Sequence, residues 1–172
     1  MQQLQLPITN NKDDVFTCVK AYLNQLHLSV VQHDFDRPWG GFFVIDELQT
    51  TQFITCFFSH LQLANVMISD KLSPKILVVA PNQRLSWQYH HRRAEIWNLI
   101  AGEAAIVTSL TDAETQPQPI IQGETIKLAQ GQRHRLVGTN GYGIVAEIWQ
   151  HTIPDQPSNE DDIIRLQDDY GR

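Results

Sequence analysis

Four polar side chains have the residue types and the spacing of a metal site. Gln88 and His90 lie in LSWQYHHRRAEIW (residues 85–97), a stretch that otherwise has the composition of a β-strand. Residues two apart in a strand point to the same side, so these two side chains can project together. Glu95 lies beyond a short turn and can return to the same point on a neighbouring strand. His134, just after the turn glycine of LAQGQRHRLV, is a fourth candidate ligand.

The four side chains offer two imidazole nitrogens, one carboxylate and one amide oxygen. This donor set suits a borderline divalent ion, zinc first, with manganese, iron, cobalt or nickel as alternatives. It leaves one or two coordination positions open for a substrate. His91 is set aside because its side chain should point away from Gln88 and His90. The alternative interpretation is that these histidines are ordinary surface or hydrogen-bonded residues, since each half of the motif alone is loose.

The bulk properties predict one cytoplasmic domain. With 172 residues and 42% hydrophobic content, the chain is long enough for one well-packed core and too short for two. A net charge of −6 argues against a non-specific nucleic-acid binder. The apolar runs fall far short of the roughly 20 residues that cross a bilayer, and MQQLQLPITN lacks a signal-peptide layout. Cys18 and Cys56 lie in apolar periodic segments, which predicts buried free thiols.

Along the chain, the elements that must position the candidate ligands are predicted to be helices at the N-terminal end, followed by strands. Apolar residues recur every three or four positions from Asn11 to about His27, which predicts a helix with Asn11 as its N-cap. A second short helix is expected near residues 51–61, although its aromatic and β-branched content also suits a strand.

After residue 70, short β-branched and aromatic runs alternate with turn residues, which predicts a sandwich or a barrel. The candidate strands are residues 42–45, 75–79, 95–100, 104–108, 119–121, 125–128 and 142–149. The expected turns are Ala101-Gly102, Gln122-Gly123, Gln130-Gly131 and Asn140-Gly141.

The ligand spacing resembles the paired motifs of the cupin superfamily. Four segments together resemble, more specifically, the isomerase domain of type II mannose-6-phosphate isomerases: RPWGGFFVI (37–45), KILVVAPNQRLSWQYHHRRAEIW (75–97), GQRHRL (131–136) and EDDIIRLQDDYGR (160–172). The resemblance implies a mainly β, cupin-type double-stranded β-helix (jelly-roll) barrel with one or two N-terminal helices. We expect a helical extension at residues 1–36 and the barrel, with a packed C-terminal tail, at residues 37–172.

The resemblance also implies an activity, that of a metal-dependent aldose–ketose isomerase acting on a sugar phosphate. Mannose 6-phosphate and fructose 6-phosphate form the leading pair, and Gln88, His90, Glu95 and His134 match the family's metal ligands. Type II enzymes often carry a guanylyltransferase domain as well, but the 172-residue sequence contains no Gly-rich nucleotide loop followed by a basic residue. Arg92 and Ile96 stand where the family often has histidines, a departure that bears on the substrate more than on the metal.

The remaining candidate site residues are cationic or hydroxylic. Lys75 is a candidate base, or alternatively a solvated strand end, and Arg165 is a candidate catalytic residue, or alternatively an ion-pair partner of its acidic neighbours. Arg84, Ser86, Arg93 and Arg135 are the candidate substrate-binding residues.

Two other functions stay open. One is a non-catalytic sugar-binding cupin module, and the other is a different metal cupin enzyme such as a dioxygenase. A homodimer is compatible with the expected helical extension and barrel strands, whereas no nucleic-acid partner is expected.

Overall fold

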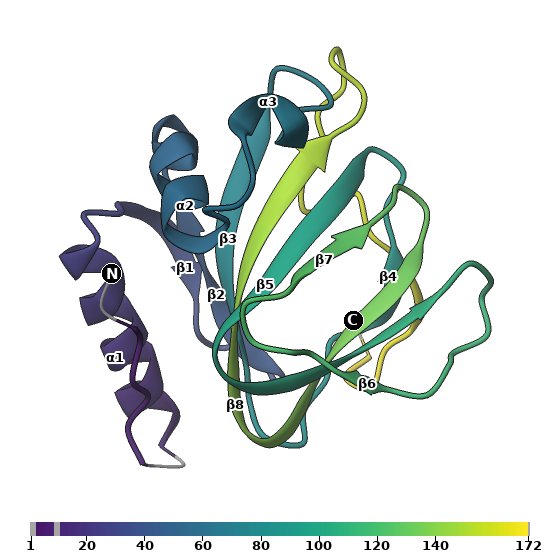
Figure 1. The fold of residues 1–172 in the computed structure, drawn as a ribbon. Helices are drawn as coiled ribbons and strands as arrows, with labels where there is room; N and C mark the ends of the chain where they lie inside the picture. Colours follow the sequence, from purple (N-terminus) through teal and green to yellow (C-terminus); the bar gives the residue numbers. More distant parts are fainter. Residues whose placement is uncertain (1–2, 9–10, 172) are drawn as a thin grey trace.

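The computed structural model describes residues 3–8 and 11–171, and within them the protein is mainly β, as predicted (Figure 1). The helices are α1 (Lys12–Gln25), the 3-10 turn η1 (Glu47–Gln49), α2 (Thr50–Phe57) and α3 (Leu63–Val66). The strands are β1 (Val30–Asp34), β2 (Gly40–Ile45), β3 (Leu72–Val79), β4 (Trp87–Tyr89), β5 (Arg93–Ser109), β6 (Gln118–Pro119), β7 (Thr125–Leu128), β8 (Arg133–His151) and β9 (Ile164–Gln167).

Two long antiparallel strands, β5 and β8, form the frame of a jelly-roll barrel (Figure 1). The strands are paired in the order β1-β2-β3-β8-β4-β9, and β5 pairs with β8, β7 and β6. The turns expected at Ala101-Gly102 and Asn140-Gly141 are wrong, because both dipeptides lie inside continuous strands. The register of β5 on β8 shifts around Gly102, so the glycine bends the strand through a bulge and does not reverse it. The turns at Gln122-Gly123 and Gln130-Gly131 are confirmed.

The sequence patterns missed the short polar strands β1 and β9. Most residues of β1 and all four of β9 have exposed side chains, so neither strand shows an apolar alternation. Each is held by pairing with a neighbour, β1 with β2 and β9 with β4. The domain division at residue 36 stays a prediction, and β1, which precedes it, belongs to the sheet.

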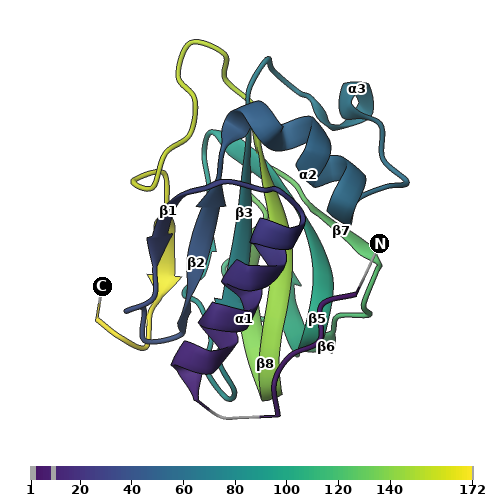
Figure 2. The same cartoon turned by 90° about the vertical axis from the view of Figure 1, so that its left-hand side faces the viewer.

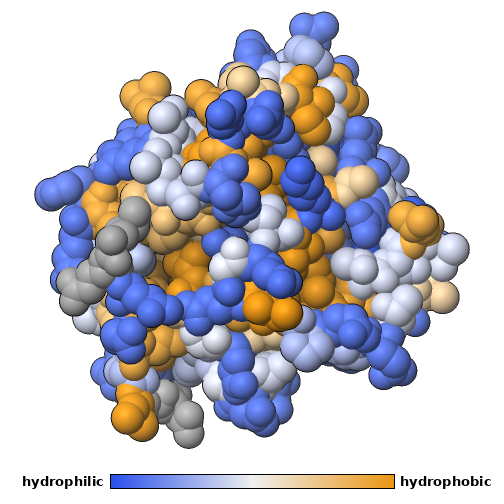
Figure 3. All heavy atoms as spheres, in the orientation of Figure 1, coloured by the Kyte–Doolittle hydropathy of each residue, from blue (hydrophilic) through white to orange (hydrophobic). Residues whose placement is uncertain are grey.

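Alternate residues of the central strands build two apolar cores on opposite faces of the sheet. The face under α1 and α2 carries Phe43, Ile76, Ile96 and Ile144 (Figure 2). The other face lines the barrel and carries Phe42, Leu77, Trp97 and Val145. All eight residues of β3 are buried, because this strand has a core on each side. On the outside, hydrophilic side chains cover most of the face seen in Figure 3, with hydrophobic ones exposed in the hollows between them.

The row of side chains that points into the barrel is charged toward one end. Lys75 precedes the inward Leu77 at the two-residue period of β3, Glu147 follows Val145 on β8, and Arg93 and Glu95 precede Trp97 on β5. All four charged residues are buried. The alternation that makes the apolar core therefore also places ionisable groups inside the barrel.

The helical layer matches the sequence analysis in its main features. Asn11 caps α1, since its side chain accepts a hydrogen bond from the Asp13 amide at 2.9 Å. Cys18 on α1 and Cys56 on α2 are free thiols as predicted, but they are half-buried and not fully buried, because each lies at the border of its helix's apolar face. None of the helices in the described ranges is long and apolar enough to span a membrane.

Substitution of Gly102 tests whether this glycine is required for the bend in β5. Gly102 has a φ of +70°, and a Cβ built there would lie 1.9 Å from the Tyr142 carbonyl oxygen. Gly123 has a φ of +86°, but no described atom lies within 4 Å of its Cβ position. We expect Gly123→Ala to lower the free energy of unfolding by about 1 kcal/mol through the left-handed backbone alone. Gly102→Ala should cost at least about 3 kcal/mol, because the backbone must also move.

Urea denaturation of the two alanine variants beside the wild type measures this difference. Equal losses in both variants would show that the close approach of β5 and β8 at Gly102 does not constrain the fold.

Candidate metal centre

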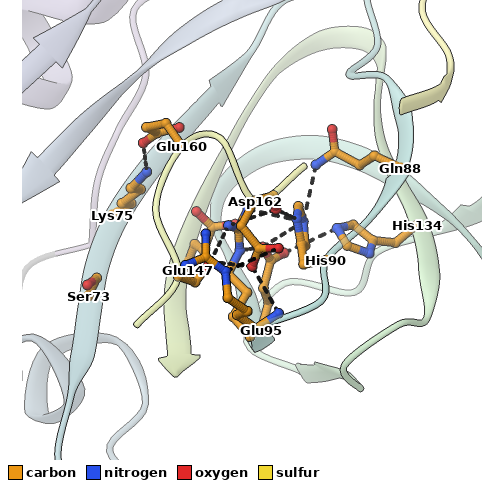
Figure 4. Close-up of polar contacts among 12 residues, drawn as sticks. Ser73, Lys75, Gln88, His90, Glu95, His134, Glu147, Glu160 and Asp162 are labelled. Carbon is orange, nitrogen blue, oxygen red and sulfur yellow. Dashed lines mark hydrogen bonds and ion pairs between the residues drawn. The ribbon is translucent and has the colours of Figure 1, made fainter. Parts of the chain in front are cut away.

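Three of the four predicted metal ligands meet inside the barrel (Figure 4). His90 directly follows β4, Glu95 lies on β5 and His134 on β8, and each is only 2% exposed. His90 Nε2 lies 3.2 Å from Glu95 Oε1, and His134 Nε2 lies 3.3 Å from Glu95 Oε2. One ligand atom from each residue lies within 4.8 Å of the others, so one ion could contact all three.

Both histidines are held in the orientation that ligation requires. His90 Nδ1 donates a hydrogen bond to the Asp162 carbonyl oxygen at 2.6 Å, and His134 Nδ1 donates to the Gln132 carbonyl oxygen at 3.0 Å. A neutral imidazole with its proton on Nδ1 has its lone pair on Nε2. The His134 lone pair therefore faces Glu95, whereas the His90 lone pair accepts a hydrogen bond from Arg93 Nη2 at 3.1 Å. Backbone acceptors fix both tautomers, as they do in metal-binding histidines.

The pair formed by His134 and Glu95 fits a cation. Glu95 Oε2 and His134 Nε2 are both buried, and neither has a hydrogen-bond partner among the described residues. Two electron-pair donors that face each other across 3.3 Å need a proton or a cation between them. When His134 is neutral, with its proton on Nδ1, a divalent ion between the two atoms would satisfy both.

Arg93 supplies a permanent positive charge at the other side of Glu95. Its Nε donates to Glu95 Oε1 at 2.8 Å, and its Nη2 lies 3.1 Å from His90 Nε2. The guanidinium also stacks on the Trp149 ring, 3.6 Å from its centroid. The Glu95 carboxylate is thus shared between a built-in cation and the candidate metal position.

Gln88, the fourth predicted ligand, lies beside the centre with its amide nitrogen toward it. Its Nε2 is 3.5 Å from His90 Nε2, and its Oε1 accepts a hydrogen bond from Ser86 at 2.5 Å. Rotation of the amide by 180° would present the oxygen to the centre and let Ser86 accept from the nitrogen. Gln88 can therefore join the donor set without moving its backbone.

Burial and charge act against each other on these groups. Burial lowers the pKa of His90, which keeps its imidazole neutral at pH 7. Burial alone would raise the pKa of Glu95, but the charged Arg93 guanidinium bonded to it opposes burial, and the pKa lies well below its ordinary value. Glu95 is therefore an ionised ligand.

The sequence analysis missed Glu147, a second buried carboxyl group in the barrel. It pairs in register with Lys75 on β3 and with Trp97 on β5, whose Nε1 donates to Glu147 Oε1 at 3.0 Å. Burial, with the nearby Glu95 charge, raises the pKa of Glu147 to about 8. The alternation Val145, Glu147, Trp149 could have indicated that this glutamate points inward.

One pocket joins the candidate metal centre to most of the predicted binding residues. Gln88 and Glu95 line it together with Ser86, Arg93, Lys75 and Arg165. Arg165 faces Gln88 in the register of β9 on β4. Trp39 also lines this pocket, as do Arg37 and Trp149, which the sequence analysis did not consider as site residues.

Arg84 and Arg135 do not line that pocket. Arg84 forms an ion pair with Asp169 on the surface. Arg135 is buried and donates to Glu114 at 2.9 Å and to the Gln167 carbonyl oxygen at 3.2 Å. The structure thus assigns both guanidinium groups to contacts with loops and the C-terminal tail.

The C-terminal tail is clamped onto the metal-ligand segment through Asp162. Its carboxylate accepts hydrogen bonds from the backbone amides of His91 and Arg92, each at 3.0 Å, and from Ser158 Oγ at 2.7 Å. Arg92 binds the tail as well, through the Pro157 carbonyl oxygen and the Asn159 side chain. Of the two neighbouring arginines, Arg92 therefore holds the tail and Arg93 enters the pocket.

Ser73, His151 and Glu47 lie close together but lack the geometry for nucleophilic catalysis. His151 Nδ1 accepts a hydrogen bond from the Ser158 amide at 2.9 Å, so the ring proton lies on Nε2, 2.9 Å from Ser73 Oγ. Ser73 in turn donates to Glu47 at 2.5 Å. The imidazole is a donor to the serine and cannot act as its base. This cluster connects the tail to β3.

A jelly-roll barrel with two histidines and a glutamate turned into its interior defines a cupin fold with a candidate metal site. The family model described as mannose-6-phosphate isomerase C-terminal matches residues 52–168, and the chain belongs to this family. The capsular polysaccharide assembling protein CapF from Staphylococcus aureus has the same fold, with a TM-score of 0.51 and 15% identity over 79% of this chain and 34% of that chain. Vicilin from tomato does too, with a TM-score of 0.51 and 16% identity over 78% of this chain and 35% of that one.

Curated relatives are longer enzymes. The chain is 27% identical to a mannose-1-phosphate guanylyltransferase of Salmonella montevideo, over 95% of this chain and 29% of the relative. It is 26% identical to a mannose-1-phosphate guanylyltransferase of Escherichia coli, over 85% and 24%, and 25% identical to the alginate biosynthesis protein AlgA of Pseudomonas aeruginosa, over 79% and 22%. The chain thus spans less than a third of the length of these relatives.

These relatives correct the predicted function. The resemblance implied an aldose–ketose isomerase acting on mannose 6-phosphate and fructose 6-phosphate, but the relatives that carry this domain are named guanylyltransferases and biosynthesis proteins. The isomerase prediction is therefore wrong, although the family takes its name from an isomerase. The ligand motif reflects a fold and a donor set, and a fold does not by itself fix a function.

Metal binding should depend on His134 and not on His91. At a zinc concentration about 100 times Kd, binding should raise the unfolding temperature of the wild type by roughly 5–10 °C. His134→Ala removes one of the facing electron-pair donors and should abolish this shift. His91→Ala is the matched control, because His91 is exposed and its backbone amide contact to Asp162 is retained.

Thermal unfolding with and without zinc, together with metal analysis of the dialysed proteins, measures this effect. A zinc shift that survives in His134→Ala would place the ion elsewhere.

Glu147 should make the stability of the metal-free protein depend on pH. Between pH 6.5 and 8 the folded Glu147 keeps a proton that an unfolded glutamate, with a pKa of 4.5, has released. The free energy of unfolding should therefore fall as the pH rises through this range. His151, whose pKa burial lowers to about 4, is neutral in the folded protein but half protonated at pH 6.5 when unfolded, so it opposes the slope near pH 6.5 and adds almost none near pH 8.

Urea denaturation in the presence of a chelator at several pH values gives this slope. Glu147→Gln should flatten it, and an unchanged slope in that variant would assign the titration to another group.

Proposed function

We propose that this chain is a metal-binding cupin domain that binds a phosphorylated sugar in its barrel pocket. The observation that carries the proposal is the set of side chains that line one pocket. It combines the metal-ligand residues Gln88 and Glu95 with the cationic side chains of Arg37, Lys75 and Arg165 and with aromatic rings. Binding, and not isomerisation, is the function proposed.

The metal proposed is zinc, held by His90, Glu95 and His134 and, after amide rotation, by Gln88. Two imidazoles with one carboxylate are a common zinc donor set, and such sites keep a position for an exogenous ligand. A divalent ion bound there would attract the hydroxyl oxygens of a sugar. Arg93, bonded to Glu95, would orient the carboxylate from the side away from His134.

The other pocket residues suit a sugar phosphate. Trp39 and Trp149 offer aromatic surfaces of the kind that pack against the apolar face of a sugar ring. Arg165 lies at the exposed rim, where a guanidinium can form paired hydrogen bonds with a phosphate. Relatives named mannose-1-phosphate guanylyltransferases suggest mannose 1-phosphate as the first ligand to test.

Calorimetric titration with mannose 1-phosphate and with mannose tests this proposal. Zinc-loaded protein should bind mannose 1-phosphate, and chelation should weaken the affinity by about tenfold or more. Arg165→Met should weaken mannose 1-phosphate binding without changing the affinity for mannose, because only the phosphate is lost as a partner.

Arg84→Met removes a partly exposed positive charge outside the pocket and serves as the control, with an unchanged affinity expected. No binding of mannose 1-phosphate, or equal affinities for the sugar and its phosphate, would contradict the proposed function.

A further inference from the structure

Lys75 is a buried ammonium group held in an aromatic setting inside the pocket. Its side chain is only 6% exposed, and Nζ lies 3.5 Å from the centroid of the Trp149 ring and 5.2 Å from that of Phe42. Aromatic faces attract a cation but do not neutralise its charge. A buried ammonium in such a site requires an anion beside it.

The anion beside Lys75 in the structure comes from the C-terminal tail. Glu160 forms an ion pair and hydrogen bond with Lys75 Nζ (Figure 4). The two partners differ in exposure, since the Glu160 side chain is 54% exposed. Glu160 can therefore turn into water once another anion takes its place, whereas the buried Lys75 cannot follow it.

The backbone that carries Glu160 is anchored on both sides. Ser158 bonds to His151 through its amide and to Arg93 through its hydroxyl, and Asp162 bonds to the amides of His91 and Arg92. Glu160 lies between these buried anchors in a turn closed by the Asp162 amide and the Asn159 carbonyl oxygen. The side chain of Glu160 can thus leave Lys75 without displacement of the tail.

We propose that Lys75 is the anion subsite of this pocket and that the Glu160 carboxylate occupies it as an internal substitute until the ligand's phosphoryl group displaces it. This inference rests on the proposed function for the identity of the ligand. A phosphoryl group carries more negative charge than a carboxylate and offers three acceptor oxygens, so it competes well for one ammonium group. The neighbouring Arg165 and the candidate metal centre lie along the same pocket and favour the same exchange.

The inference predicts that removal of the Glu160 charge strengthens binding. Glu160→Gln should tighten the affinity for mannose 1-phosphate several-fold at low ionic strength and leave the affinity for mannose unchanged. Asp161→Asn is the matched control, because it removes the same charge from the next residue, which does not line the pocket. It should change the affinity much less.

The gain should require Lys75. Lys75→Met keeps the aliphatic stem beside Trp149 and should weaken mannose 1-phosphate binding by roughly tenfold or more. Lys71→Met, a lysine substitution outside the pocket, should not. In the double variant Lys75→Met/Glu160→Gln, the glutamine should bring no further gain, since the ammonium for which the two anions compete is absent.

Calorimetry with mannose 1-phosphate and then with inorganic phosphate separates this inference from the proposed function. If mannose 1-phosphate fails to bind but inorganic phosphate binds with the same dependence on Lys75 and Glu160, the proposed function fails and the anion subsite stands. If Glu160→Gln does not strengthen binding of either probe, or if its gain persists without Lys75, the subsite is overturned. Circular dichroism and thermal unfolding of each variant confirm that the fold is retained.

Discussion

The antiparallel pairing of β5 with β8 is the constraint on which the rest of the structure depends. The two strands pair along nearly their whole lengths, and a bulge at Gly102 bends β5 from one part of the barrel to the next. Side chains alternate strictly between the two faces of such a pair. A shift of one residue would move Glu95, Trp97 and Glu147 out of the barrel and their neighbours in. The apolar core and the polar site therefore both depend on this one register of β5 on β8.

The inside of the barrel accommodates charge because each buried ion has a defined partner. Glu95 binds Arg93 and faces the imidazole of His134, while Lys75 binds Glu160. Glu147 avoids the cost of a buried charge differently, since burial raises its pKa until the neutral acid prevails at pH 7. Removal of one partner from such a network is costly, because the other charge stays buried.

The C-terminal tail is a structural part of the pocket. β9 pairs with β4 and sets Arg165 opposite Gln88, and Asp162 holds both the tail and the Nδ1 proton of His90. The tail thus orients a candidate metal ligand from one side and contributes Glu160 to the pocket from the other.

The sequence by itself determined the fold class, the helix at residues 12–25 and the candidate ligands, because these depend on short-range periods of two and 3.6 residues. Gln88, His90 and Glu95 could be grouped from strand geometry, and His134 from its motif. It could not determine the polar strands β1 and β9, which have no apolar period of their own.

Only the tertiary structure decided which charges meet. Asp162 reaches His90 across 72 positions of the chain and Glu160 reaches Lys75 across 85, and no local pattern records such contacts. The tertiary structure likewise distinguishes three arginines that all lie near the ligand motifs. Arg93 enters the pocket, whereas Arg84 and Arg135 do not line it. Residue type and spacing specify which groups are available, whereas burial and pairing, which arise only when distant segments pack, specify what each group can do.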